Sequence, residues 1–312
     1  MRNPILLSGL AWLLSALVVD SVVHADASAL QLHKLSDHVY AIVGPYGNRT
    51  RENLGNNATF GVVVTTQGVV LIDPGGSYRG AAVIGEVIRQ VTDEPVTVVI
   101  NTGGQDHRWL GNAYFKERGA RIIASAAAVA DQRSRLQDQM FMLGNLIGVD
   151  GLEGTEPVYA DETFTGQMRL KVGEISFELK HVGPAHTPGD SLIWLPEQQI
   201  VFSGDVVYVG RLLGVIPVSD SRNWITAFDT MGALEPKVVI PGHGPPTDLA
   251  AAKADTLDYL SFLRETVGTF MDSGGDISQV GKLDQSRFAY LANFELLSGR
   301  NAQQVYQHME WE

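Results

Sequence analysis

Aspartate and histidine side chains stand in this chain at positions from which they could bind a metal ion. An Asp-His pair follows an apolar stretch at residues 96–100, and further histidines and aspartates follow later apolar stretches. Imidazole nitrogens and carboxylate oxygens are usual ligands of Zn²⁺, and they also suit Fe or Mn. A catalytic metal needs about three protein ligands and one open position. The chain offers enough candidates for such a site: Asp106, His107, His186, Asp205 and His243.

Other polar residues near these stretches have simpler structural explanations. Asp190, in the run Thr187-Pro188-Gly189-Asp190, is typical of a turn aspartate that bonds nearby backbone. Asp73 fits a turn residue, or a group that orients a ligand histidine. The Asp106-His107 pair, taken alone, fits a structural role as well as a ligand role, and the ordered set of five favours the metal site. Four histidines of the mature chain receive no role: His33, His38, His181 and His308.

The elements that must carry these residues alternate between strands and helices. Apolar and β-branched runs predict strands at residues 38–43, 59–65, 68–72, 96–100, 121–124, 168–172, 175–181, 191–195, 200–203 and 238–240. Helical spacing predicts helices at residues 81–90, 112–118, 126–143, 224–234, 249–271, 285–297 and 302–309. This order indicates an α/β chain with mixed sheets and a helical tail. The candidate ligands then follow strand ends, with Asp205 in a connecting turn, where loops gather at one edge.

The first 25 residues have the features of a cleaved export signal. Arg2 precedes an apolar run over residues 5–19, and Val23-His24-Ala25 supplies the small residues that signal peptidase favours. An uncleaved membrane anchor is disfavoured, because the run is shorter than the ~20 apolar residues of a spanning helix and ends at Asp20. We therefore expect an exported, periplasmic protein with no stable membrane insertion after cleavage.

The composition excludes several functional classes. The chain of 312 residues has a net charge of −12, and it shows no cluster of Lys and Arg. Nucleic-acid phosphates would repel such a protein, so we expect a small-molecule substrate and no nucleic acid. The absence of cysteine excludes disulfides, thiolate ligands and a cysteine nucleophile. No oligomeric state is predicted.

Short motifs follow one another along the chain: Asn101-Thr102 with Asp106-His107, Gly183-Pro184-Ala185-His186-Thr187-Pro188-Gly189-Asp190, Phe202-Ser203-Gly204-Asp205 and Pro241-Gly242-His243-Gly244. Their order resembles that of the metallo-β-lactamase superfamily. The chain is most similar to its periplasmic members associated with quinoprotein and sulfur-oxidation gene neighbourhoods. The resemblance covers about residues 30–270 and implies an αββα sandwich of two mixed sheets with the site at one edge. Together with the export signal and the helical spacing of the tail, this predicts a signal peptide over residues 1–25, the family-like domain over 30–270 and a helical C-terminal extension over 271–312.

The resemblance also shows which family ligands this chain lacks. The family's metal loop reads His-x-His-x-Asp-His, and counting back from Asp106 places Gly104 and Thr102 where its first two histidines stand. A shift by one residue restores neither imidazole. In the family, those two histidines and the counterpart of His186 hold one metal. That first site is therefore incomplete here.

The second metal site of the family keeps its counterparts in Asp106, His107 and His243, and Asp205 matches a carboxylate that bridges two metals in many members. We expect a single Zn²⁺, with Fe as the alternative, and Asp205 as a fourth ligand or a neighbour. Such a metal lowers the pKa of water and would drive hydrolysis of an ester, thioester or lactam carbonyl. Asp106 or Asp205 could orient the water, and His186 would complete the metal shell or donate a hydrogen bond to substrate.

Two other functional classes stay open. One is a non-catalytic periplasmic binding or maturation factor on a degenerate scaffold, which the absent histidines suggest. The other is an iron-dependent enzyme of the persulfide-dioxygenase kind. The glycine-rich loops at residues 44–57 and 141–158 could flank the cleft, although ordinary surface loops fit them equally. Candidate contacts to a ligand are Tyr46, Arg49, Arg51 and Trp109.

Overall fold

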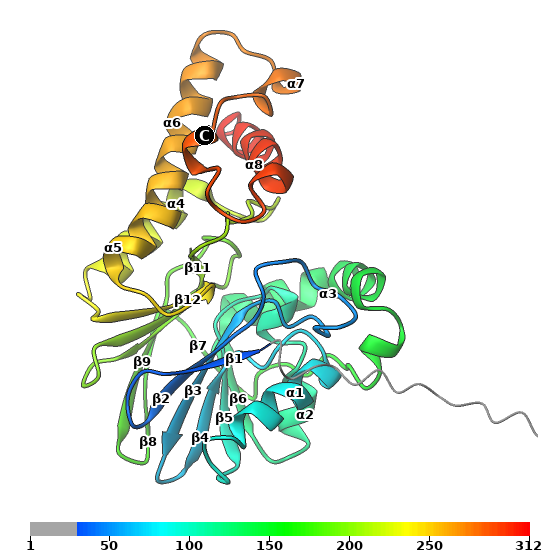
Figure 1. Cartoon of the computed structure of the whole chain (residues 1–312), viewed down its shortest axis with the longest axis vertical. Coiled ribbons are helices and arrows are strands. Elements are labelled where there is room, and N and C mark those ends of the chain that lie inside the picture. Colours follow the sequence, from blue (N-terminus) through cyan, green and yellow to red (C-terminus); the bar gives the residue numbers. More distant parts are fainter. Residues whose placement is uncertain (1–29) are drawn as a thin grey trace, which may run out of the picture.

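The computed structural model describes residues 30–312, so the expected signal peptide at residues 1–25 lies outside the described residues. The chain forms two β-sheets, and helices cover their outer faces (Figure 1). This arrangement confirms the predicted αββα sandwich with mixed sheets. Within residues 30–312, no helix combines the length and the apolar character that a membrane crossing requires.

The first sheet has seven strands in the order β1-β2-β3-β4-β5-β6-β7. Pairing is antiparallel from β1 to β4 and parallel from β4 to β7. Every residue of β4 is buried, as expected for an apolar strand covered on both faces. The strands are β1 (Gln31–Lys34), β2 (Val39–Val43), β3 (Thr59–Thr65), β4 (Gly68–Ile72), β5 (Val96–Asn101), β6 (Arg121–Ser125) and β7 (Glu162–Phe164).

The second sheet has five strands in the order β12-β11-β10-β9-β8. Only β11 and β12 pair in parallel, and their register shifts on both sides of Gly204. Because the pairing of β11 with β12 continues past this shift, β11 extends to Tyr208 and includes Asp205. The expectation that Asp205 lies in a connecting turn was therefore wrong. The strands are β8 (Gln167–Val172), β9 (Ile175–His181), β10 (Ser191–Leu195), β11 (Ile200–Tyr208) and β12 (Val238–His243).

Three apolar layers hold the sandwich together. Phe177 and Phe202 pack between the sheets, Ile84 of α1 packs on the outer face of the first sheet, and Trp224 of α4 packs on that of the second. Burying each such side chain contributes about 1.5–3 kcal/mol. The helices are α1 (Tyr78–Ile88), α2 (Asn112–Lys116), α3 (Ala126–Ile147), α4 (Ser221–Gly232), α5 (Leu249–Ala252), α6 (Asp258–Asp272), α7 (Ile277–Val280) and α8 (Phe294–Met309).

The C-terminal helices lie together at one end of the molecule, beyond the sheets (Figure 1). A π-helical segment at Lys253–Leu257 joins α5 to α6, and Val305 of α8 shares the apolar layer of α4 and α6. The helix expected at residues 285–297 was wrong for most of its length, because Ser286–Phe288 forms a 3-10 turn and only residues 294–297 are α-helical, as the start of α8. Asn293 has a left-handed backbone, with φ of 66°, and α8 begins directly after it. The domain limits at 270 and 271 stay a prediction.

Candidate metal centre

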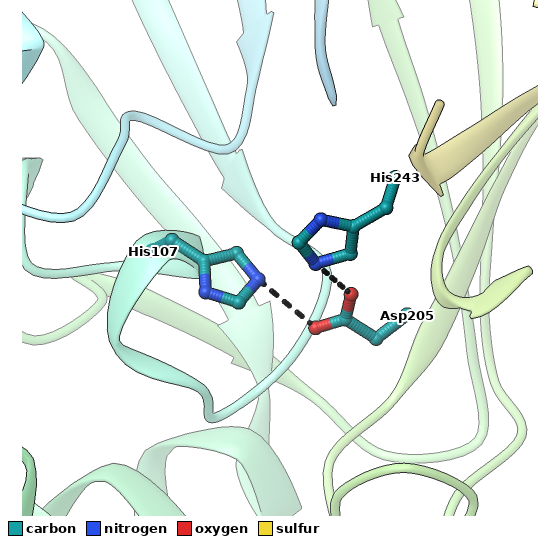
Figure 2. A group of neighbouring side chains, drawn as sticks. All are labelled: His107, Asp205 and His243. Atoms are coloured by element: carbon teal, nitrogen blue, oxygen red, sulfur yellow. Dashed lines mark hydrogen bonds and ion pairs between the residues drawn. The ribbon is translucent and has the colours of Figure 1, made fainter. Parts of the chain in front are cut away.

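Three of the five expected ligands come together where the two sheets meet. His107 lies on a 3-10 turn after β5, Asp205 lies in β11, and His243 ends β12. One donor atom of each residue lies within 4.8 Å of the other two. His107 Nε2 is 3.2 Å from Asp205 Oδ2, and His243 Nε2 is 3.3 Å from Asp205 Oδ1. Figure 2 shows the two imidazoles directed at the two oxygens of one carboxylate.

The protonation state of His243 makes the group of His107, Asp205 and His243 suitable for a metal ion. Its Nδ1 lies 2.9 Å from the carbonyl oxygen of Asn57, so this nitrogen donates its proton to the backbone. Nε2 therefore presents a lone pair to Asp205. Burial lowers the pKa of His243 well below its usual value, and Arg211 lowers it further. Near neutral pH, Nε2 of His243 therefore stays unprotonated beside the Asp205 carboxylate. Two imidazoles and a carboxylate that face one another in this way fit a divalent metal with a further position open.

Arg108 is the main residue of the site that the sequence did not reveal. Its guanidinium is buried and donates to both oxygens of Asp205, with distances of 2.7 Å from Nη2 and 3.2 Å from Nε. It also donates to Asp73 at 2.9 Å and to the carbonyl oxygen of Gly242 at 2.8 Å. A Cβ at Gly242 would lie 2.6 Å from Arg108 Nη2, so this contact requires glycine. Burial opposes ionisation of Asp205, but Arg108 and His107 outweigh it and hold the carboxyl pKa well below its usual value.

Asp73 orients this arginine. Its backbone is left-handed, with φ of 63°, a conformation that costs a non-glycine residue energy and is therefore held by its surroundings. The carboxylate accepts from the backbone N and the hydroxyl of Thr102, both at 2.7 Å, and from Arg108. The sequence suggested that Asp73 is either a turn residue or a group that orients a ligand histidine. The structure supports an orienting role, but the side chain that Asp73 orients is Arg108 and not a histidine.

Asp106 lies on the other side of the His107 ring from Asp205. Its Oδ1 accepts from the backbone N of His107 at 2.7 Å and lies 2.9 Å from His107 Nδ1. Arg49 Nη2 donates to the same oxygen at 2.6 Å. Burial raises the energy of the charged carboxylate, but Arg49 and His107 outweigh this and lower its pKa. The geometry therefore gives Asp106 the task of orienting His107, and it leaves Asp106 outside the group of three.

We expect Asp106→Ala to keep its metal, with an affinity reduced about 10- to 100-fold, because only the orientation of a ligand is lost. His107→Ala should lose the metal altogether. Competition titration against a chromophoric chelator measures both affinities. If Asp106→Ala lost metal as completely as His107→Ala, Asp106 would be a direct ligand, as the sequence suggested.

His186 lies close to the group of three but does not join it. Its Nδ1 is 3.0 Å from the carbonyl oxygen of Gly214, so Nδ1 donates and Nε2 keeps its lone pair. The ring centroid is 5.9 Å from that of Tyr208, which stacks on His243 at 4.7 Å. Burial lowers the pKa of His186 to about 4, so this imidazole is neutral over most of the pH range. Ser219 Oγ donates to the carbonyl oxygen of His186 and fixes its loop.

Protein side chains fill the space beside the loop at residues 102–105, where the resembled motif has histidines. A Cβ at Gly104 would lie 1.8 Å from Asp131 Oδ2, and a Cβ at Gly103 would lie 2.7 Å from Asp190 Oδ1. Gln139 donates to the carbonyl oxygen of Gly104 at 2.8 Å. Asp190 accepts from the backbone N of Thr187, which confirms it as a turn residue. Larger side chains at these glycines would require α3 and the turn to move.

The contacts also favour one register of the motif. His107 and Arg108 both contact Asp205, whereas Asp106 does not. This fits an alignment of the His-x-His-x-Asp-His loop that is shifted by one residue from the alignment with Asp106 at the motif's aspartate. His107 then stands at the motif's aspartate and Arg108 at its last histidine. Gly103 and Gln105 take the places of the first two histidines.

Two arginines lie at the imidazoles of the site. Arg49 Nη2 is 2.8 Å from His107 Nδ1, and Arg211 Nη1 is 3.4 Å from His243 Nδ1. Arg49 was among the expected ligand contacts, and Arg211 was not. The expectation that Trp109 contacts a bound ligand was wrong, because its side chain is fully buried and donates a hydrogen bond to Gln139. The sequence signal for Arg211 was its position a few residues after Asp205.

Comparison with known proteins identifies relatives of this chain. Residues 55–243 match a family model described as the metallo-beta-lactamase superfamily. The chain is 25% identical over 241 residues to a type 2 metallo-beta-lactamase of Elizabethkingia meningoseptica, covering 76% of this chain and 87% of that protein. A type 2 metallo-beta-lactamase of Bacillus sp. (strain 170) is 27% identical over 203 residues, or 64% of this chain and 71% of that protein.

Solved structures share the same fold. A metallo-beta-lactamase from Pontibacter korlensis superimposes with a TM-score of 0.58 and 23% identity, covering 74% of this chain and 99% of that one. The inverting sec-alkylsulfatase Pisa1 from Pseudomonas sp. superimposes with a TM-score of 0.66 and 17% identity, covering 89% of this chain and 50% of that one. At these identities the likeness concerns the fold.

Proposed function

Because this chain belongs to the metallo-β-lactamase superfamily, we propose that it is an exported, periplasmic hydrolase that uses a single zinc ion bound by His107, Asp205 and His243. The observation that carries this proposal is the contact between two imidazoles and one carboxylate, in which the unprotonated Nε2 of His243 faces Asp205. Nitrogen and oxygen donors of this kind suit Zn²⁺, with iron as the alternative.

The surroundings of the three ligands support one metal rather than two. Arg108 already places a permanent positive charge on Asp205, the carboxylate that would otherwise bridge two metals. Asp131 and Asp190 occupy the space beside Gly104 and Gly103. A second ion would therefore meet a guanidinium and filled space instead of histidine ligands.

The chain's own side chains have distinct tasks in this proposal. A divalent metal at these ligands supplies a Lewis acid that polarises a carbonyl and lowers the pKa of water. Asp205 and the two histidines hold it, and Asp106 fixes the ring of His107. His186 offers a neutral imidazole whose Nε2 can accept a proton or a hydrogen bond from the reactants. The substrate is a small molecule with an ester, thioester or lactam carbonyl.

This function is tested with the protein lacking residues 1–25, stripped of metal by a chelator and reloaded with zinc or with iron. We expect turnover of at least one of an ester, a thioester and a lactam with zinc, and none in the stripped protein. Lack of turnover in every case would favour a non-catalytic factor. Oxygen uptake with a persulfide only in the iron form would favour a dioxygenase.

A further inference from the structure

Arg211 holds a positive charge beside the metal centre without an acidic partner in the part of the chain that the structure describes. Its Nη1 is 3.4 Å from His243 Nδ1, and its guanidinium lies 5.9 Å from the ring centroid of Tyr208. Its Nε is buried and has no hydrogen-bond partner. By contrast, Arg49, Arg108 and Arg135 each form an ion pair with an aspartate. A half-buried guanidinium left unpaired is costly unless another group supplies the missing acceptors.

Arg49 approaches the same centre from the other imidazole. Its Nη2 contacts Asp106 and lies 2.8 Å from His107 Nδ1, while its Nε is buried with no hydrogen-bond partner. The ring centroids of His107 and His243, the two imidazoles that these arginines approach, lie 5.1 Å apart. Two arginines with unused N–H donors thus lie beside two imidazoles of the metal centre. The group that matches such donors is an oxyanion.

The backbone around Arg211 is held firmly in place. Gly210 N donates to Asp255 in the π-helical segment at 2.8 Å, and Leu212 N donates to the carbonyl oxygen of Ala292 at 2.8 Å. Asn301 of α8 accepts from Val215 N at 2.9 Å and donates to the carbonyl oxygen of Leu213 at 2.8 Å. The C-terminal helices therefore build the loop that presents this arginine, so its position is fixed by the fold.

We propose that Arg49 and Arg211 bind an anionic group of the substrate, so that the proposed hydrolase acts on a carbonyl compound that carries an oxyanion close to the bond that is broken. This inference rests on the proposed function and adds the charge of its substrate. Arg211 contributes most, because Asp106 already neutralises Arg49. Carboxylate, sulfate and phosphate share the required chemistry, and the experiment separates them.

The binding test uses the metal-loaded protein and isothermal titration calorimetry with acetate, inorganic sulfate and inorganic phosphate, at an ionic strength held constant with chloride. We expect saturable binding of at least one, and the preferred ion identifies the substrate's group. Arg211→Gln should weaken this binding by at least about tenfold, because a charge-assisted hydrogen bond is lost. Arg211→Lys, which keeps the charge, should retain part of it.

The matched control is Arg264→Gln, because Arg264 is as poorly exposed as Arg49, at 15% of the side chain each, and pairs with Glu312 instead of the site. It should bind the ions like the unmodified protein, and thermal unfolding checks that each variant is folded. Equal affinity in Arg211→Gln and the unmodified protein, or no saturable binding of any ion, would overturn the proposal.

A kinetic test separates this inference from the function on which it rests. The ratio of kcat/KM for mono-4-nitrophenyl succinate over 4-nitrophenyl acetate should exceed one in the unmodified protein and in Arg264→Gln, and it should fall at least about tenfold in Arg211→Gln. If both esters are hydrolysed with a ratio that Arg211→Gln leaves unchanged, the anion site is wrong and the hydrolase stands. If neither is hydrolysed while ion binding still depends on Arg211, the anion site stands and the hydrolase is wrong.

Discussion

The variant His243→Ala is expected to lose bound metal and hydrolytic turnover together. His243 supplies one of three donor atoms that lie within 4.8 Å of one another, and its Nε2 is kept free of a proton by the bond from Nδ1 to Asn57. Loss of the metal removes several kcal/mol of stabilisation of developing charge. We therefore expect kcat/KM to fall by at least about a thousandfold, or ~4 kcal/mol.

The control for this variant is His38→Ala, a histidine that is half exposed and contacts Glu174 and the backbone of Val64 away from the site. It should keep both metal and turnover. Metal content and kcat/KM are measured on the same preparations. A His243→Ala protein that kept its metal or its turnover would remove His243 from the ligand set.

The variant Arg108→Met is expected to lower the free energy of unfolding by about 3–5 kcal/mol, because two carboxylates stay buried without their cation. Arg108 donates to both Asp73 and Asp205, and all three side chains are at most 2% exposed. Urea denaturation of the metal-free protein measures this loss without help from a bound ion. The aliphatic part of methionine fills much of the space of the arginine, so a large cavity is not the cause.

The effect should also depend on pH. The pKa of Asp205 lies well below its usual value, so its stabilising contribution is present above about pH 4 and declines as the pH falls through the folded-state pKa. The deficit of Arg108→Met should therefore be largest near neutral pH. Arg121→Met is the control, because its exposed ion pair with Glu162 is worth at most about 1 kcal/mol. Equal urea midpoints for Arg108→Met and the unmodified protein would show that Arg108 is not needed to hold this pair of carboxylates.

Most of the sandwich could be predicted from the sequence, because its buried strands are continuous apolar runs. The runs at residues 59–65, 68–72 and 96–100 correspond to β3, β4 and β5 within a residue. The short strands β1 and β7 were missed, since their residues are mostly exposed or half-buried and give no clear alternation. The helical spacing was misleading over residues 285–293, because Ala292 instead pairs its backbone with Gly210 and Leu212.

Three side chains of the candidate site could be predicted from the sequence, but two of the arginines around them, Arg108 and Arg211, could not. His107, Asp205 and His243 were found because motif order brings strand ends together. Arg108 directly follows the polar run Gln105-Asp106-His107, and an arginine in such a run is usually taken to be exposed. Its partners lie 35 and 97 residues away in the sequence, and such distant ion pairs leave no pattern of spacing.

His107, Asp205 and His243 are proposed to hold one metal ion per chain. Inductively coupled plasma mass spectrometry of the purified protein without residues 1–25 measures the element and its amount. The proposed centre predicts about one equivalent of zinc per chain, absent from His243→Ala and present in His38→Ala. Two equivalents per chain, or no metal after growth and reconstitution with zinc or iron, would contradict it.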